Sequence, residues 1–329
     1  MKKIKLMFLI ILIILLIIIG YFFVGSAPER KDITWGVNFS QKHAQNLGLD
    51  WKETYLALID DLGVQEIKIA SYWDLLEKEE GKYDFEDLDW QLNTAKDNGV
   101  NVFLVIGRKS PRWPECHIPE WAKGLDKLEQ QEKILNFLET VVLRYTDSDM
   151  ISMWQVENEP FFPFGECSWV DDEFLAEEIS LVRSLDSKNR PILISDSGEG
   201  SFWFSAASHS DIVGTTMYRK VWMSQFSRYL TYPLPPVFYW RKANLIEKFF
   251  DKEVICVELQ VEPWGPELLY SSPMEEQEKT MNLQIFKDNI EYAKKTGLRS
   301  FYLWGGEWWY WMKEVKGQAE IWEEAKKIF

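Results

Sequence analysis

A repeated junction constrains the fold of this 329-residue chain more than any other sequence feature. In three segments an amphipathic stretch ends, a glycine follows, and a short apolar run begins: LIDDLGVQEIKIA, TAKDNGVNVFLVI and YAKKTGLRSFYLW. Glycine readily adopts the left-handed backbone that ends a helix, so Gly63, Gly99 and Gly297 mark three helix-to-strand joints of one type. The repetition of one joint indicates a repeated βα unit.

The rest of the chain continues this alternation. We expect strands at about residues 33–38, 66–70, 100–106, 151–157, 191–195, 211–215, 253–258 and 299–304. We expect helices at about 50–62, 84–98, 126–146, 171–186, 241–251, 275–296 and 318–328 and a short or irregular helix in 198–209, with Asp84 as an N-cap. Eight βα units predict one closed (β/α)8 barrel over residues 33–329. The alternative, a doubly wound open sheet, would normally carry a glycine-rich phosphate loop that GVNFSQKHAQ lacks.

The N-terminal segment predicts a transmembrane helix before the barrel. Residues 6–24 are uncharged and almost wholly apolar, and a helix of that length spans about 28 Å, close to the hydrocarbon thickness of a bilayer. A cleavable signal peptide usually has a shorter apolar region, of about 7–15 residues. We therefore expect residues 1–24 to be an uncleaved anchor and 25–32 a polar linker, with secretion after cleavage near Ala27 as the alternative. Lysines at positions 2, 3 and 5 favour a cytoplasmic N-terminus and an extracytoplasmic domain.

Charge and composition exclude several classes of partner. The net charge of −15 and the lack of a basic patch argue against nucleic-acid binding. Three Cys without a CxxC pair and only three His argue against a zinc site, and no organic cofactor is implied. Cys116 and Cys167 lie in polar, loop-like contexts and would pair outside the cytoplasm, the alternative being three free buried thiols. The 17 Trp could line a ligand cleft or pack inside, and the oligomeric state stays open.

Two glutamates end apolar runs where a barrel carries its active site, at the C-terminal ends of the strands. Glu159 follows the fourth expected strand and Glu258 ends the seventh, so they could face each other across the mouth. Breaking a glycosidic bond requires one carboxylic acid to protonate the leaving oxygen and a second carboxylate to attack the anomeric carbon or activate water. Strand alternation would place Glu157 on the same face as Glu159.

The segments around these glutamates resemble a known group of enzymes. WQVENEP, at 154–160, resembles the acid/base strand of retaining glycoside hydrolases with (β/α)8 barrels, and its ending is similar to the cellulase-like family 5 and to β-galactosidases of families 35 and 42. VICVELQ, at 254–260, resembles the nucleophile strand of family 5. EEGKYDFEDLDWQLNTAKDNGVNVFLVIG resembles the second-to-third strand segment of families 5, 39 and 42. The chain departs from family 5 in having Lys68 near the usual strand-2 Arg and Thr216 in place of a strand-6 His.

The resemblance implies a retaining β-glycosidase that acts on a β-linked oligo- or polysaccharide. Glu159 would be the acid/base and Glu258 the nucleophile. Asn158 would hydrogen-bond the sugar 2-hydroxyl, Tyr218 would orient the nucleophile and Trp304 would form the platform under the reacting sugar. Other residues at the same rim that we expect to contact substrate are Trp73, Trp113 and Glu307.

Three alternatives stay open at this stage. The chain could be a non-catalytic surface glycan-binding protein on a degenerate barrel, or another barrel enzyme such as a lyase or transglycosylase. Glu262 in QVEPW is a rival nucleophile just past the seventh strand. The sequence indicates neither the sugar and its linkage nor endo or exo action.

Overall fold

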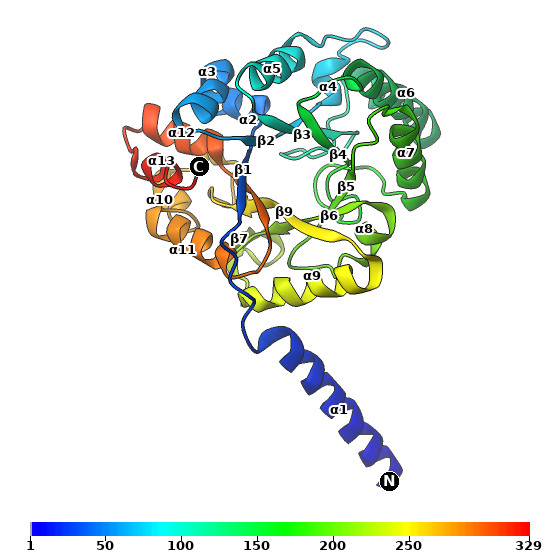
Figure 1. Ribbon diagram of the computed structural model, residues 1–329, viewed down its shortest axis with the longest axis vertical. Helices are drawn as coiled ribbons and strands as arrows, with labels where there is room; N and C mark the ends of the chain where they lie inside the picture. The colour runs from blue at the N-terminus through cyan, green and yellow to red at the C-terminus, as the bar shows by residue number, and fades with distance from the viewer. Residues whose placement is uncertain (1) are drawn as a thin grey trace.

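A computed structural model describes residues 2–329 of the chain. Eight parallel strands close into a barrel, helices surround them as a ring, and one long helix projects from the side (Figure 1). The order around the barrel is β1-β10-β9-β6-β5-β4-β3-β2, so each strand pairs with the next barrel strand along the chain and the last pairs with the first. This closure confirms the (β/α)8 fold and excludes the open sheet.

The barrel strands lie where the apolar runs were expected. They are β1 (Thr34–Asn38), β2 (Glu66–Ala70), β3 (Asn101–Ile106), β4 (Ile151–Val156), β5 (Ile192–Asp196), β6 (Ile212–Met217), β9 (Glu253–Gln260) and β10 (Ser300–Trp304). The three joint glycines have φ angles of 78°, 67° and 74° at Gly63, Gly99 and Gly297, which confirms the left-handed joints. One difference matters for the site: β9 continues to Gln260, so Glu258 lies inside the strand and not at its end.

Helices cover the outside of the barrel. They are α2 (Gln41–Asn46), α3 (Trp51–Leu56, followed by a π-helical turn at Ala57–Asp61), α4 (Trp73–Leu76), α5 (Glu86–Asp97), α6 (Lys127–Tyr145), α7 (Asp172–Leu185), α8 (Phe204–His209), α9 (Pro236–Phe250), α10 (Met274–Gln277), α11 (Leu283–Lys294), α12 (Gly306–Glu314) and α13 (Glu320–Ala325). Short 3-10 turns lie at Glu120–Ala122, Ser224–Phe226 and Leu269–Ser271.

Several helix boundaries differ from expectation, each for a local reason. The helix expected at 275–296 is split, because the Asn282 side chain accepts from the backbone N–H of Ile285 and caps a new helix. Helix α9 begins five residues early, since Pro236 at its first position already has a helical φ. Asp84 is not the N-cap of α5: Phe85 takes that position, and Asp84 accepts from the backbone N–H of Glu86 instead.

The short helices α2 and α4 were not anticipated, and neither were two elements that follow β6 and β10. A small antiparallel hairpin, β7 (Lys220–Met223) and β8 (Arg228–Thr231), follows β6, and α12 starts two residues after β10. The hairpin strands are four residues long and α12 is rich in Trp, so neither has a periodic signal that sequence reasoning could separate from a loop. Both lie at the C-terminal ends of barrel strands and so contribute to the rim of the mouth.

The core has an inner and an outer part, as strand alternation requires. Inside the barrel, five buried side chains from four strands pack together: Phe103, Leu193, Ile255, Val257 and Tyr302. A larger cluster fills the space between strands and helices, where Leu104 and Ile106 of β3 point. The inner cluster plugs the barrel below the mouth and supports the polar side chains above it.

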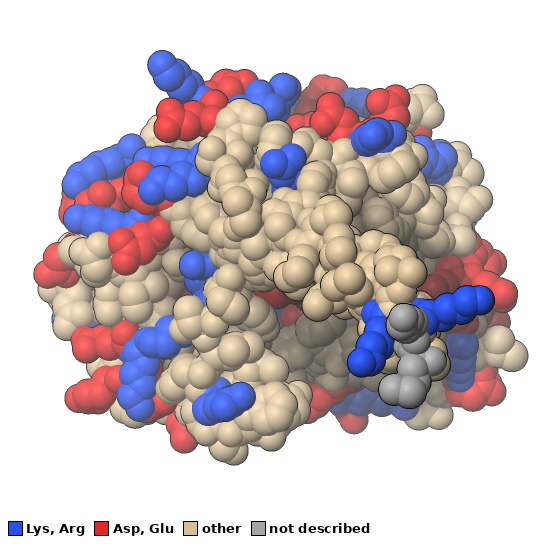
Figure 2. Space-filling model, turned by 90° about the horizontal axis from the view of Figure 1, so that it is seen from below, with Lys and Arg blue, Asp and Glu red and all other residues tan. Residues whose placement is uncertain are grey.

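The long helix α1 (Lys2–Phe23) stands apart from this core. Its span Lys3–Phe23 has a mean hydropathy of 3.3 and is exposed except near its C-terminal end, where Phe22 is buried, so it is long and apolar enough to cross a membrane. Only its end contacts the barrel, where the Phe22 ring lies 5.5 Å from that of Phe202 and 5.9 Å from that of Phe238. Figure 2 shows basic side chains near the N-terminal tip of this helix, whose residues from Leu6 on carry no charge.

Replacing Phe103 with Ala tests the inner core. Phe103 is fully buried among side chains of β5, β9 and β10, so its loss should lower the free energy of unfolding by about 3–5 kcal/mol. The measurement is urea denaturation of the detergent-solubilised full chain, followed by Trp fluorescence. Phe249→Ala, at a Phe that is 66% exposed, is the matched control and should cost less than about 0.5 kcal/mol. Equal losses in both variants would contradict the assignment of the inner core.

Candidate active site

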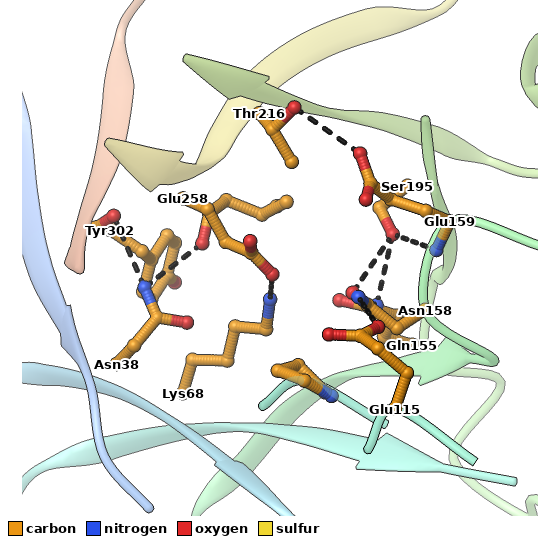
Figure 3. Close-up of polar contacts among 12 residues, drawn as sticks. Asn38, Lys68, Glu115, Gln155, Asn158, Glu159, Ser195, Thr216, Glu258 and Tyr302 are labelled. Atoms are coloured by element: carbon orange, nitrogen blue, oxygen red, sulfur yellow. Dashed lines mark hydrogen bonds and ion pairs between the residues drawn. The ribbon is translucent and has the colours of Figure 1, made fainter. Parts of the chain in front are cut away.

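Glu258 projects from β9 into the barrel mouth and is held by two donors. One carboxylate oxygen pairs with Lys68 Nζ at 3.2 Å, and the other accepts a hydrogen bond from Tyr218 Oη at 2.9 Å (Figure 3). Glu258 is 3% exposed and Lys68 is 1% exposed, so this is a buried ion pair across the barrel. Tyr218 therefore lies where the sequence placed it. Lys68, noted only as a departure from family 5, supplies the cation beside Glu258.

Glu159 lies on the other side of the mouth. Its carboxyl oxygen Oε1 accepts from Thr216 Oγ1 at 3.2 Å, its backbone N–H donates to Ser195 Oγ at 2.8 Å, and its carbonyl accepts from Lys109 Nζ at 2.9 Å. Thr216 is also the register partner of Glu258 in the β6–β9 pair. Both glutamates are thus adjacent to Thr216, and Figure 3 shows them facing the same space.

The surroundings of Glu159 favour its protonated form. Burial, the negative charge of Glu258 and that of Glu115 raise the pKa of Glu159 well above its ordinary value. Glu258, in contrast, has an ammonium group and a phenol directed at its two oxygens. Two carboxyl groups at one mouth therefore have opposite environments, one suited to holding a proton and one to holding a negative charge.

Asn158 is oriented by its neighbours before any ligand binds. Its Oδ1 accepts from Gln155 Nε2 at 2.9 Å and from Ser195 Oγ at 3.3 Å. Its Nδ2 therefore points the other way and donates to Glu115 Oε2 at 3.1 Å. Glu115 is a third buried carboxyl at the mouth, and sequence reasoning missed it because it lies in the middle of the loop after β3.

The loop after β3 is held in place by the only disulfide among residues 2–329. Cys116 is bonded to Cys167, with 5.3 Å between their Cα atoms, so the expected pairing is present, and the remaining thiol, Cys256, is buried. The bond joins the loop after β3 to the loop after β4. Glu115 and Glu159 therefore lie on two segments that are covalently linked next to the site.

The expectation for Glu157 was wrong. Its carboxylate accepts from the backbone N–H groups of Arg108 at 2.6 Å and Lys109 at 2.7 Å, on the side of α7 and the buried Glu178. Strand β4 ends at Val156, and the positive φ of 58° at Glu157 turns the chain, so alternation no longer applies. A cavity of about 140 Å³ opens on this outer side, and neither Glu159 nor Glu258 lines it.

Arg112, in the loop after β3, organises another part of the rim. Its guanidinium lies over the Trp304 ring, 3.9 Å from the ring centre, and pairs with Glu262 and, at 3.1 Å, with Glu307. Burial alone would raise the pKa of Glu262, but the nearby Arg112 and His43 outweigh it and lower that pKa to about 2. Glu262 is therefore committed to an ion pair, which disfavours it as a nucleophile. A guanidinium covers one face of Trp304, which is 6% exposed, and the role of this ring as a sugar platform stays a prediction.

Two of the expected substrate contacts are wrong in this structure. Glu307 has no exposed surface: it accepts from Arg112 and from the backbone N–H of Ser40. Trp73 is also fully buried, because α4 starts immediately after β2 and turns the indole into the helical layer, where its Nε1 donates to Glu77 at 2.7 Å. Trp113, at 47% exposed, does lie at the rim, and its role in binding stays a prediction.

Removing the charge of Glu258 should change the protonation of Glu159. Because the negative charge of Glu258 is a cause of the raised pKa of Glu159, Glu258→Gln should lower that pKa. The pKa of Glu159 is measured by infrared difference spectra across a pH titration. The Glu159→Gln variant identifies the band of the Glu159 carboxyl. Glu66→Gln removes a partly buried carboxyl at the start of β2 and should leave the titration unchanged. An unshifted titration in Glu258→Gln would mean that the two carboxyls do not interact.

Comparison with known proteins gives consistent matches. The model of glycosyl hydrolase family 10 matches residues 52–175. β-Galactosidase Bga of Halorubrum lacusprofundi is 27% identical over 128 residues, which cover 33% of this chain and 18% of that protein. Endo-1,4-beta-xylanase 3 of Hypocrea jecorina is 25% identical over 190 residues, which cover 55% of this chain and 51% of that protein. The chain thus spans about half, or less, of the length of these relatives.

Solved structures share the fold at lower identity. GH5_18 from Bifidobacterium longum has a TM-score of 0.59 at 13% identity, covering 83% of this chain and 70% of its own. Xylanase 10B of Thermotoga petrophila has a TM-score of 0.56 at 15% identity, and the match covers 83% of this chain and 82% of the xylanase chain. The family 10 match, which sequence analysis had not named, lies within the same clan as the families that it did name. By these matches the chain is similar to glycoside hydrolases, and it shares the closed (β/α)8 barrel of the solved structures.

Proposed function

We propose that this protein is a retaining β-glycosidase that hydrolyses O-glycosidic bonds in a β-linked oligo- or polysaccharide. Glu159 is its acid/base and Glu258 its nucleophile. The observation that carries the proposal is the pair of buried carboxyls at one mouth, with a proton favoured on Glu159 and an ion pair to Lys68 at Glu258. The β-galactosidase and the xylanases among the matches support the class of bond, and the sugar stays open.

In the first step Glu258 attacks the anomeric carbon and forms a glycosyl ester while the bond to the leaving oxygen breaks. Glu159 gives its proton to that oxygen. Tyr218 and Lys68 hold the Glu258 carboxylate in position for attack. Asn158, already oriented by Gln155, presents its amide toward the substrate.

In the second step water replaces the leaving group. Once Glu258 is an ester it carries no negative charge, so one cause of the raised pKa of Glu159 is gone. Glu159 is then a carboxylate that can accept a proton from the attacking water, and the ester breaks to release the sugar and free Glu258. The same electrostatic coupling therefore supports the acid role first and the base role second.

Alanine substitutions with azide rescue test these roles. Glu258→Ala and Glu159→Ala should each lower the turnover of an aryl β-glycoside by about 100-fold or more. Azide can replace a missing carboxylate, so Glu258→Ala should yield the α-glycosyl azide and Glu159→Ala the β-glycosyl azide, identified by NMR. Glu166→Ala, at an exposed rim carboxyl, is the control and should retain wild-type turnover. Wild-type turnover in Glu258→Ala would exclude Glu258 as the nucleophile. If the wild-type protein binds sugar without any hydrolysis, the glycan-binding alternative is favoured.

We also propose that α1 anchors the barrel domain in a membrane. The domain then lies outside the cytoplasm, where it meets its carbohydrate substrate. The exposed apolar span Lys3–Phe23 supports a membrane helix. The bond between Cys116 and Cys167 suits an oxidising compartment. Secretion after cleavage is the competing arrangement.

Fractionation of native protein decides between anchor and signal peptide. The uncleaved chain should stay with the membrane through an alkaline carbonate wash, because a span of this hydropathy partitions into lipid. N-terminal sequencing of the same fraction should then find no new terminus after Ala27. A soluble protein that begins near Pro28 would contradict the anchor.

A further inference from the structure

The third carboxyl at the mouth, Glu115, has no part in the proposed mechanism. It is 7% exposed and lies beside Asn158, whose Nδ2 donates to its Oε2 at 3.1 Å. Figure 3 shows it on the same side of the cavity as Asn158, facing Lys68 and Glu258. A buried carboxyl is costly to maintain without a partner, so its presence in this position calls for a role.

The position of Glu115 is built into the loop. Its carbonyl accepts from the backbone N–H of Ser110 at 2.8 Å, and its own N–H donates to the carbonyl of Arg112 at 2.7 Å. The next residue, Cys116, is in the disulfide. Glu115 also has a positive φ of 72°, a backbone conformation that persists only where the surroundings enforce it. The carboxyl is thus placed against Asn158 by its backbone.

The cations near Glu115 are committed to other groups. Lys68 is paired with Glu258, and Lys109 Nζ donates to the carbonyls of Glu159 and Phe162. Within residues 2–329, no basic side chain lies within 4.0 Å of the Glu115 carboxyl, and no hydrogen bond reaches its Oε1. Burial raises the pKa of Glu115 to about 8, although Lys109 lowers it. The mouth has an excess of acidic groups that a cationic ligand would offset.

We propose that Glu115 selects a substrate whose reacting sugar carries a free amino group at position 2, as in a β-linked glucosamine polymer. This rests on the proposed function, in which Asn158 lies at the sugar 2-position. An ammonium group there would donate to Glu115 and lie between it and Glu258. A neutral sugar would leave the extra carboxyl without a cation. The net charge of −15 would also attract a cationic polymer.

Paired aryl glycosides test the selectivity. The wild-type full chain should hydrolyse 4-nitrophenyl β-D-glucosaminide with a kcat/KM at least about tenfold above that for the β-D-glucoside. Glu115→Gln keeps the shape and the acceptor for Asn158 but cannot become a carboxylate beside a bound ammonium group. It should lower kcat/KM for the glucosaminide by about 10- to 100-fold more than it lowers that for the glucoside, because any effect through Glu159 or Asn158 is common to both substrates. Glu166→Gln makes the same change in net charge at an exposed rim position and should alter neither.

A binding measurement separates this proposal from the proposed function. Calorimetry on the full-length Glu159→Gln variant, which lacks the proposed acid but keeps the pair of Lys68 and Glu258, should show tighter binding of the β-1,4-linked glucosamine disaccharide than of cellobiose. Adding Glu115→Gln should remove that difference. If neither disaccharide is preferred, or if Glu115→Gln weakens both alike, amine selection is wrong while hydrolysis can still stand. If no glycoside is hydrolysed but the preference for the amine persists, the proposed function fails and the selectivity remains.

Discussion

The ion pair between Lys68 and Glu258 is the interaction on which the chemistry of this barrel depends. Both side chains are almost free of solvent, and neither charge would be tolerated there without the other. The pair holds a negative charge at a fixed point in the mouth. That charge is felt at Glu159, where it favours the protonated acid. One buried cation on β2 therefore holds in place the carboxylate whose negative charge raises the pKa of Glu159.

The loop after β3 gives the mouth its individual character. It contributes Arg112, which joins Glu262 and Glu307 into one ion-pair cluster beside Trp304, and Glu115, which lies against Asn158. The bond from Cys116 fastens this loop to the one that carries Glu159. The common barrel supplies the two proposed catalytic positions, and a single tethered loop supplies groups that surround them.

Sequence reasoning succeeded where a strong local pattern coincided with the fold. Short apolar runs between capped helices identified the barrel strands, and the motif around Asn158 identified the mouth. It failed where the backbone departs from regular geometry: the positive φ at Glu157 turned that carboxylate outward, and an immediate helix start buried Trp73. Lys68 could have been found, because a lysine between Ile67 and Ile69 in a strand points into a barrel and requires an acidic partner. Glu115 could not have been found from the sequence, because a loop has no periodic pattern that predicts where its side chains point.

The place where α1 leaves the barrel limits what the mouth can reach. In Figure 1 the helix departs from the side of the ring beside α9, not from the end where the strands finish. If that helix stands in a bilayer, the opening looks along the cell surface and not straight out from it. The connecting stretch, residues 24–33, is at most about 33 Å when fully extended. A domain tethered in this way would reach only carbohydrate that lies close to its own membrane.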